Sequence, residues 1–178
     1  MLKPLRNKVI AEQLSIYTKS LGGVYLASSA KETLRKATVV SSAVQGIKEG
    51  DVIYPRKYTW QTFRYNEKDL ISISLDHILA IERNGEFYAV RDMVLAKIEY
   101  KEKIGSFYVP GTRKQYRADF LGRCVSVGPE YKYDLKKGDL VYITRIEDAG
   151  HEGHKIDTPQ GVLWAIKSKW VVAIKPND

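Results

Sequence analysis

The sequence contains a single cysteine, Cys124, among its 178 residues. One cysteine excludes an internal disulfide and any zinc site built from several thiolates. Cys124 lies between Arg123 and Val125, in a short valine-containing segment, which is typical of a buried strand residue rather than of a reactive nucleophile. The low cysteine content fits a reducing compartment, so we expect a cytoplasmic protein.

The sequence also lacks long apolar runs and long basic runs. No apolar run approaches the roughly 20 residues that a membrane-spanning helix needs, and Met1–Arg6 has no apolar segment of the secretory type. We therefore expect neither a membrane contact nor export. Lys and Arg outnumber Asp and Glu by 29 to 21, but they form no basic arm of the kind that binds nucleic acid. The excess charge still permits attraction to an acidic partner.

The two halves of the chain repeat the same short motifs in the same order. The matching pairs are residues 6–11 with 91–96, 22–26 with 105–109, 48–54 with 136–142, and 79–81 with 172–174. The spacing between matching residues drifts by only a few residues, as loop insertions would cause. We therefore predict two tandem units, residues 1–87 and residues 88–178.

Each half contains five short runs rich in Val, Ile and Leu, separated by turn residues. The expected strands are 8–12, 38–41, 51–54, 70–73 and 78–81 in the first half, and 93–97, 123–127, 139–143, 162–166 and 170–174 in the second. Helical patterns are scarce, so we predict an all-β fold of two small barrels or sandwiches with little helix. We expect long loops at residues 58–68 and 147–160.

In these segments the chain resembles the chaperonin-10 (GroES-like) co-chaperonins. Residues 4–10 (PLRNKVI) are similar to the family's first strand, and both Lys-x-Gly-Asp segments are similar to its Val-Gly-Asp-x-Val strand. Gly122–Gly128 resembles its Gly-x-Val-x-x-Val-Gly strand, and Asp76–Ile81 resembles its last strand. The resemblance covers nearly the whole chain, twice, and implies two tandem GroES-like small β-barrels.

The family's mobile loop carries two glycines followed by apolar residues, and it orders when it binds a chaperonin. The residues that match are Gly22, Gly23, Val24, Tyr25 and Leu26 in the first half, and Gly105, Ser106, Phe107, Tyr108 and Val109 in the second. The resemblance implies that these loops bind a chaperonin double ring, that the chain forms a homo-oligomeric ring, and that it assists protein folding. Without the resemblance, each segment is also typical of a turn that leads into a strand.

Two departures from the family favour an alternative. Ser42–Ile47 and Pro129–Leu135 are too short for the roof hairpin that co-chaperonins commonly carry. A chain of two units also cannot evenly fill the odd-numbered ring of the family. The alternative is a structural ring or connector of a larger assembly, such as a virus particle, built on the same fold.

The sequence carries no recognisable catalytic motif. It has no GxGxxG nucleotide turn, which together with the single cysteine excludes the medium-chain dehydrogenases that share this fold, and no Ser elbow or P-loop. Asp148–His154 brings two histidines close to carboxylates, but its glycines are typical of a solvated loop and not of a His-Glu-x-x-His helix. We expect no enzymatic activity, no metal and no cofactor.

Aromatic and basic residues are interleaved in one stretch of the first half. The aromatic residues are Tyr54, Tyr58, Trp60, Phe63 and Tyr65, and the basic residues are Arg56, Lys57 and Arg64. On a small β-barrel this pattern can form a stacking surface for single-stranded nucleic acid. Packing within a strand explains the same alternation. Nucleic-acid binding is therefore the third and least favoured hypothesis.

Overall fold

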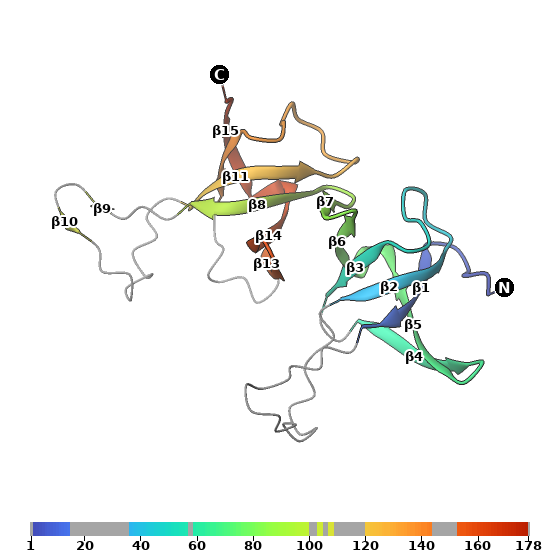
Figure 1. Ribbon diagram of the computed structural model, residues 1–178. Coiled ribbons are helices and arrows are strands. Elements are labelled where there is room, and N and C mark those ends of the chain that lie inside the picture. The colour runs from blue at the N-terminus through green and yellow to red at the C-terminus, as the bar shows by residue number, and fades with distance from the viewer. Residues whose placement is uncertain are drawn as a thin grey trace, which may run out of the picture. The chain divides into compact units, whose positions relative to one another are not determined.

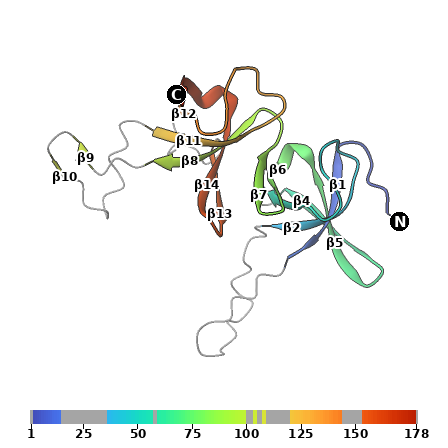
Figure 2. The ribbon, with the colours of Figure 1, turned by 45° about the horizontal axis from the view of Figure 1, so that its top comes forward.

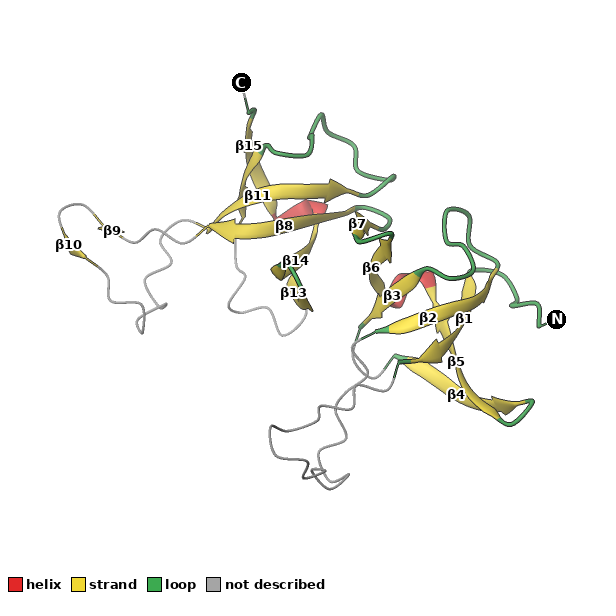
Figure 3. Cartoon of the chain, in the orientation of Figure 1, coloured by secondary structure: helices red, strands yellow, loops and turns green. Residues whose placement is uncertain are grey.

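The computed structural model describes residues 2–14, 36–56, 59–99, 103–104, 107–108, 120–143 and 153–177. Strands dominate these residues, and the helical elements among them are two single-turn 3-10 helices (Figure 3). The chain divides into two compact units, unit 1 (Met1–Glu86) and unit 2 (Phe87–Asp178). The prediction of an all-β fold with two small barrel-like units and little helix is confirmed. No helix in the described ranges is long and apolar enough to cross a membrane.

The sheet of unit 1 has the strand order β4-β5-β1-β2-β3-β6, and β7, which begins at the boundary between the units, pairs with β6 as the seventh strand (Figure 1). Its elements are β1 (Lys8–Gln13), β2 (Ala37–Ser42), β3 (Val52–Pro55), β4 (Trp60–Tyr65), β5 (Lys68–Ser74), the 3-10 helix η1 (Leu75–His77), β6 (Ile78–Arg83) and β7 (Glu86–Ala89). Val9 and Ala11 of β1 lie opposite Ile73 and Ile71 of β5, and all four side chains are buried. Because alternate residues of a strand share a face, these four form one side of the core.

Unit 2 has a six-stranded sheet in the order β13-β14-β8-β11-β12-β15. Its elements are β8 (Met93–Glu99), β11 (Phe120–Val127), β12 (Leu140–Ile143), β13 (Gly153–Thr158), β14 (Gly161–Lys167), the 3-10 helix η2 (Ser168–Trp170) and β15 (Val171–Lys175), with a short hairpin of β9 (Lys103–Ile104) and β10 (Phe107–Tyr108). Val94, Cys124, Val141 and Ile166 belong to its buried core. These residues come from β8, β11, β12 and β14, and Val171 and Ile174 of β15 pack against them.

The six strands of unit 2 follow the same order as β4-β5-β1-β2-β3-β6 of unit 1. The register agrees as well, because Val9 pairs with Ile73 in β1–β5 and Val94 pairs with Ile166 in β8–β14. Bulges also recur. The β3–β6 register shifts after Tyr54, and the β12–β15 register shifts after Tyr142. The two units thus share strand order, register and bulge positions.

A Gly-Asp turn leads into the third strand of each unit. Gly50 has φ +86° and Gly138 has φ +100°, a backbone conformation that glycine adopts without a steric penalty. The Gly50 amide donates to the Val39 carbonyl at 2.9 Å, and the Gly138 amide donates to the Cys124 carbonyl at 2.8 Å. The repeated sequence motif therefore marks a repeated turn.

The prediction of long loops at residues 58–68 and 147–160 was wrong for most of the residues that the structure describes there. Trp60–Tyr65 is strand β4, paired with β5, and Gly153–Thr158 is strand β13, paired with β14 (Figure 2). Among the described strands, both lie at the edge of a sheet and pair on one side only, so they retain many exposed polar residues and resemble loops in sequence. Trp170, expected to begin the last strand, lies instead in η2.

Candidate binding loops and assembly edge

The structure describes only a small part of the predicted chaperonin-binding loops. The residues outside the described ranges are Gly22, Gly23, Val24, Tyr25, Leu26, Gly105, Ser106 and Val109. Phe107 and Tyr108 form β10, in which Phe107 lies opposite Ile104 and Tyr108 lies opposite Lys103 of β9. These two residues therefore lie in a short strand, and binding by either loop stays a prediction.

Paired strands define where each predicted loop leaves its unit. In unit 1, β1 and β2 stay paired up to Gln13 and Ala37, and the first loop joins these two ends. In unit 2, β8 and β11 stay paired up to Glu99 and Leu121, and the second loop joins the matching ends. The two loops therefore connect equivalent strands of the two units.

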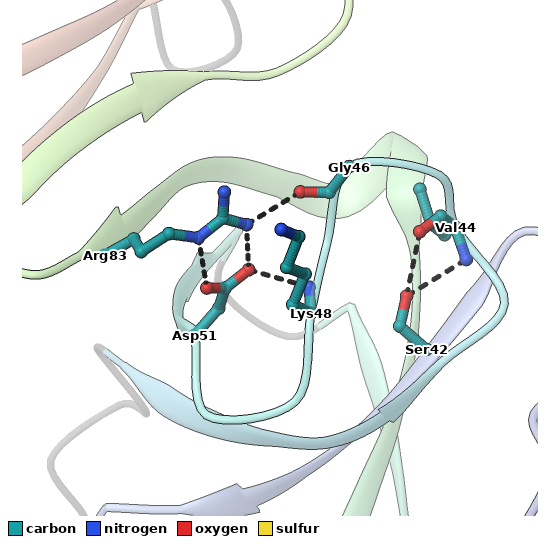
Figure 4. Close-up of polar contacts among 6 residues, drawn as sticks. All are labelled: Ser42, Val44, Gly46, Lys48, Asp51 and Arg83. Carbon is teal, nitrogen blue, oxygen red and sulfur yellow. Dashed lines mark hydrogen bonds and ion pairs between the residues drawn. The ribbon is translucent and has the colours of Figure 1, made fainter.

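A buried carboxylate holds the turn before β3 (Figure 4). Asp51 is 3% exposed, and its Oδ1 accepts from Arg83 Nε at 2.7 Å. Its Oδ2 accepts from Arg83 Nη2 and from the Lys48 amide, each at 2.7 Å. Arg83 Nη2 also donates to the Gly46 carbonyl at 2.9 Å. We call this group of Asp51, Arg83, Lys48 and Gly46 the Asp51 clamp.

The charge of Asp51 is stabilised despite its burial. Burial by itself raises the pKa of Asp51, but the hydrogen bonds from Arg83 and the Lys48 amide outweigh it and hold the pKa below its ordinary value of 3.8. The clamp joins the β2–β3 connection to the last residue of β6. The repeated Lys-x-Gly-Asp motif pointed to this turn, whereas no pattern in the sequence singled out Arg83.

Unit 2 holds the equivalent carboxylate differently. Asp139 Oδ2 accepts from the Lys136 amide at 2.8 Å, and Oδ1 accepts from the Asn177 amide at 3.0 Å. These two backbone hydrogen bonds lower the pKa of Asp139. The Asn177 amide thus fills the role that the Arg83 side chain has in unit 1.

The last strands of the two units differ sharply in exposure. In β6, Leu79 is 5% and Ala80 is 0% exposed, whereas in β15 the matching residues Val172 and Ala173 are exposed, Val172 at 59%. On its outer edge β6 has β7 as a neighbour, but among the described strands β15 has none. We call β15, with its open edge, the assembly edge. Unpaired apolar strand edges are templates for pairing with another chain.

The tyrosines on the strands that pair with β6 and β15 show the same difference in exposure. Tyr54 of β3 is 4% exposed and donates to Glu82 Oε2 at 2.6 Å, and burial followed by this hydrogen bond raises its pKa. Tyr142 of β12 is 38% exposed and lies opposite Ala173. The apolar surface at the assembly edge therefore includes Tyr142.

The other residues considered for reactivity, metal binding or base stacking lie in environments that favour a structural role. Burial raises the pKa of Cys124 to about 11, so its thiol stays protonated at neutral pH and its reactivity is low. No group of His, Cys, Asp and Glu in the described ranges could hold a metal ion; most of the predicted polar loop, including His151, lies outside them. Trp60 and Phe63 are half-buried and lie opposite Ile73 and Leu70, an arrangement that favours packing over base stacking.

Comparison with known proteins gives this fold a family. Residues 1–82 match the family described as the Chaperonin 10 Kd subunit. The co-chaperonin GroES of Lactobacillus delbrueckii subsp. bulgaricus is 30% identical over 92 residues, which cover 46% of this chain and 98% of that protein. The co-chaperonin GroES of Clostridium botulinum is 32% identical over 90 residues (45% and 96%), and that of Thermodesulfovibrio yellowstonii is 33% identical over 86 residues (45% and 94%). The chain belongs to the chaperonin 10 family.

Proposed function

We propose that this protein is a tandem co-chaperonin, with GroES-like units at residues 1–87 and 88–178, that forms a ring and caps a chaperonin to assist protein folding. One observation carries the proposal. The first half of the chain aligns with nearly the full length of co-chaperonins, and unit 2 repeats the strand order and register of unit 1. In this role it catalyses no reaction and uses no cofactor.

The binding segments in this proposal are Gly22–Leu26 and Gly105–Val109. Their glycines permit a turn, and their apolar side chains supply a modest affinity after the cost of ordering the segment is subtracted. Equivalent strands carry both segments, so a ring would present many of them at once. Simultaneous binding of several weak segments produces firm attachment.

The assembly edge supports the ring. In unit 1 the segment after the turn at Asn84 supplies β7 as an outer neighbour of β6. By sequence offset, β7 matches residues 1–4 of the chain, and the neighbouring Leu5 is 78% exposed. We propose that the N-terminal segment of a second copy covers β15 as β7 covers β6. Repetition of this contact closes a ring with an even number of units.

Binding to a purified double-ring chaperonin, measured with and without nucleotide, tests the function. We expect nucleotide-dependent binding by the wild type and loss of binding by the double variant Val24→Asp/Phe107→Asp. Size and circular dichroism of the variant serve as controls for assembly and folding. If several chaperonins fail to bind at micromolar protein, the capping role is wrong.

Analytical ultracentrifugation tests the ring. Val172→Asp places a charge on an exposed residue of the assembly edge, so we expect folded but dissociated chains. The matched control is Tyr65→Asp, which changes a partly exposed apolar residue on β4 and should leave the assembly intact. A variant at Val172 that assembles as well as the wild type would exclude this interface.

The same two experiments distinguish the capping role from the alternative, a structural ring or connector. The specific observation in its favour is the short β2–β3 connection, which the Asp51 clamp fixes in place of a roof hairpin. A stable ring that binds no chaperonin is the outcome expected for this alternative.

A further inference from the structure

The tip of the β6–β7 hairpin is formed by the dipeptide Asn84-Gly85. Asn84 and Gly85 are its only two loop residues, both are exposed, and both have positive φ, +53° and +79°. Two positive φ angles in a two-residue loop define the type I′ turn, for which Asn-Gly is a preferred sequence. The same dipeptide that makes the turn also places an amide side chain next to the backbone nitrogen of a residue that has no side chain.

We propose that Asn84 is a site of spontaneous deamidation that alters the β6–β7 hairpin as the protein ages. The Gly85 nitrogen, after losing its proton, attacks Cγ of Asn84 and forms a five-membered imide. The bond from Cγ to the side-chain nitrogen breaks, and ammonia leaves with the proton it needs. Water then opens the imide at either carbonyl, giving aspartate or isoaspartate. Because Gly85 has no Cβ, no side chain hinders the attack.

A second hairpin of the chain provides an internal comparison. Asn66 and Glu67 join β4 to β5, both are exposed, and their φ angles are +47° and +62°. The turn and the exposure therefore match those of Asn84 and Gly85. The residue after the asparagine differs, and the Glu67 side chain crowds the nitrogen that would attack. Asn66 is therefore expected to react more slowly than Asn84.

The product changes the hairpin on one side more than on the other. Isoaspartate inserts an extra methylene into the main chain, which a two-residue turn with fixed register does not accommodate. On the β6 side, Arg83 is anchored through two hydrogen bonds to Asp51 (Figure 4). On the other side, β7 is a four-residue edge strand, so we expect the adjustment to loosen β7 while β6 keeps its place.

Peptide mass spectrometry of the full-length protein, incubated folded at mildly alkaline pH, tests the proposal. We expect residue 84 to be converted several-fold faster than residue 66 and to yield both aspartate and isoaspartate. Hydrogen exchange of β7 should quicken in step with the conversion. Equal rates at the two asparagines, or no conversion of Asn84 while an unfolded peptide of the same sequence reacts, would overturn the proposal.

Two variants isolate the cause. Asn84→Gly keeps a residue that tolerates positive φ but removes the amide, so β7 should keep its exchange protection during the same incubation. Glu67→Gly gives Asn66 an unhindered neighbour and should raise its rate to that of Asn84. If Asn66 stays slow in that variant, the following residue does not control the reaction and the inference is wrong. None of these outcomes depends on chaperonin binding or ring assembly.

Discussion

Unit 1 and unit 2 hold the same Gly-Asp turn with different partners. In unit 1 the carboxylate of Asp51 binds a guanidinium, that of Arg83. In unit 2, within the part of the chain that the structure describes, the carboxylate of Asp139 binds two backbone amides, those of Lys136 and Asn177. The Lys48 and Lys136 amides occupy equivalent positions, so this part of the turn is common to both units. The fold therefore requires a carboxylate that accepts hydrogen bonds at this position, while the second donor can be a side chain or the main chain.

A single glycine gives the largest expected difference between the units. Gly128 and Ala43 are equivalent, since their amides donate to the carbonyls of Met93 and Lys8 at the start of matching strands. A Cβ on Gly128 would lie 2.2 Å from the Arg91 carbonyl oxygen, and the backbone cannot yield cheaply. We expect Gly128→Ala to lower the free energy of unfolding of unit 2 by about 3 kcal/mol.

A denaturant titration, in which hydrogen exchange monitors the unfolding of each unit, measures this effect. The matched change, Ala43→Gly, should cost unit 1 no more than about 1 kcal/mol. Comparable losses from the two substitutions would show that the connections after β2 and β11 are packed alike, contrary to the close approach at Gly128.

The Asp51 clamp gives the next effect. Arg83→Gln removes the charge that faces a buried carboxylate, so Asp51 keeps only part of its hydrogen bonding. Complete burial of such a pair would make the loss larger, but the Arg83 side chain is 31% exposed, and we expect a loss of about 2 kcal/mol in unit 1. Arg123→Gln is the matched control, because the hydrogen bond from Arg123 to the Gly138 carbonyl is exposed. If both variants unfold at the same denaturant concentration, the clamp contributes no more than a surface contact.

The pH dependence of stability sharpens the same comparison. The pKa of Asp51 is lower in the folded chain than its ordinary value of 3.8. Its contribution to stability is therefore complete above pH 3.8 and is lost as the pH falls through the folded-state pKa. In Arg83→Gln the folded-state pKa of Asp51 should rise toward or above 3.8, so the stability that this group loses on acidification should become smaller or vanish. Unfolding free energies of wild type and variant across the acid range check this, and parallel curves would contradict it.

The sequence predicted the strands better than the contacts between them. All ten expected strands overlap observed strands, and nine of them contain buried apolar residues; the exception is β15, whose residues are half-buried or exposed. The edge strands β4 and β13 were missed, since an edge strand with exposed polar residues looks like a loop. Arg83 was missed for a different reason. Its partner Asp51 lies 32 residues away, and no local pattern reports a contact at that separation.

The smallest expected effect concerns the one cysteine. Cys124 and Val39 are equivalent, because the amide of each donates to the carbonyl of the following Gly-Asp turn, at Asp139 and Asp51 respectively, at 2.8 Å. Both are buried, at 2% and 1% exposure. Cys124→Val is close to a volume-conserving change, and we expect a cost below about 1 kcal/mol.

Thiol labelling extends this comparison to both sites. In the folded wild type, burial and a pKa of about 11 should keep Cys124 unreactive toward an alkylating reagent at neutral pH. A chain with Cys124→Val and Val39→Cys moves the thiol to the equivalent place in unit 1, and it should be equally protected until the unit unfolds. Rapid labelling at one site only would show that the two cores open at different rates, even though their strands share order and register.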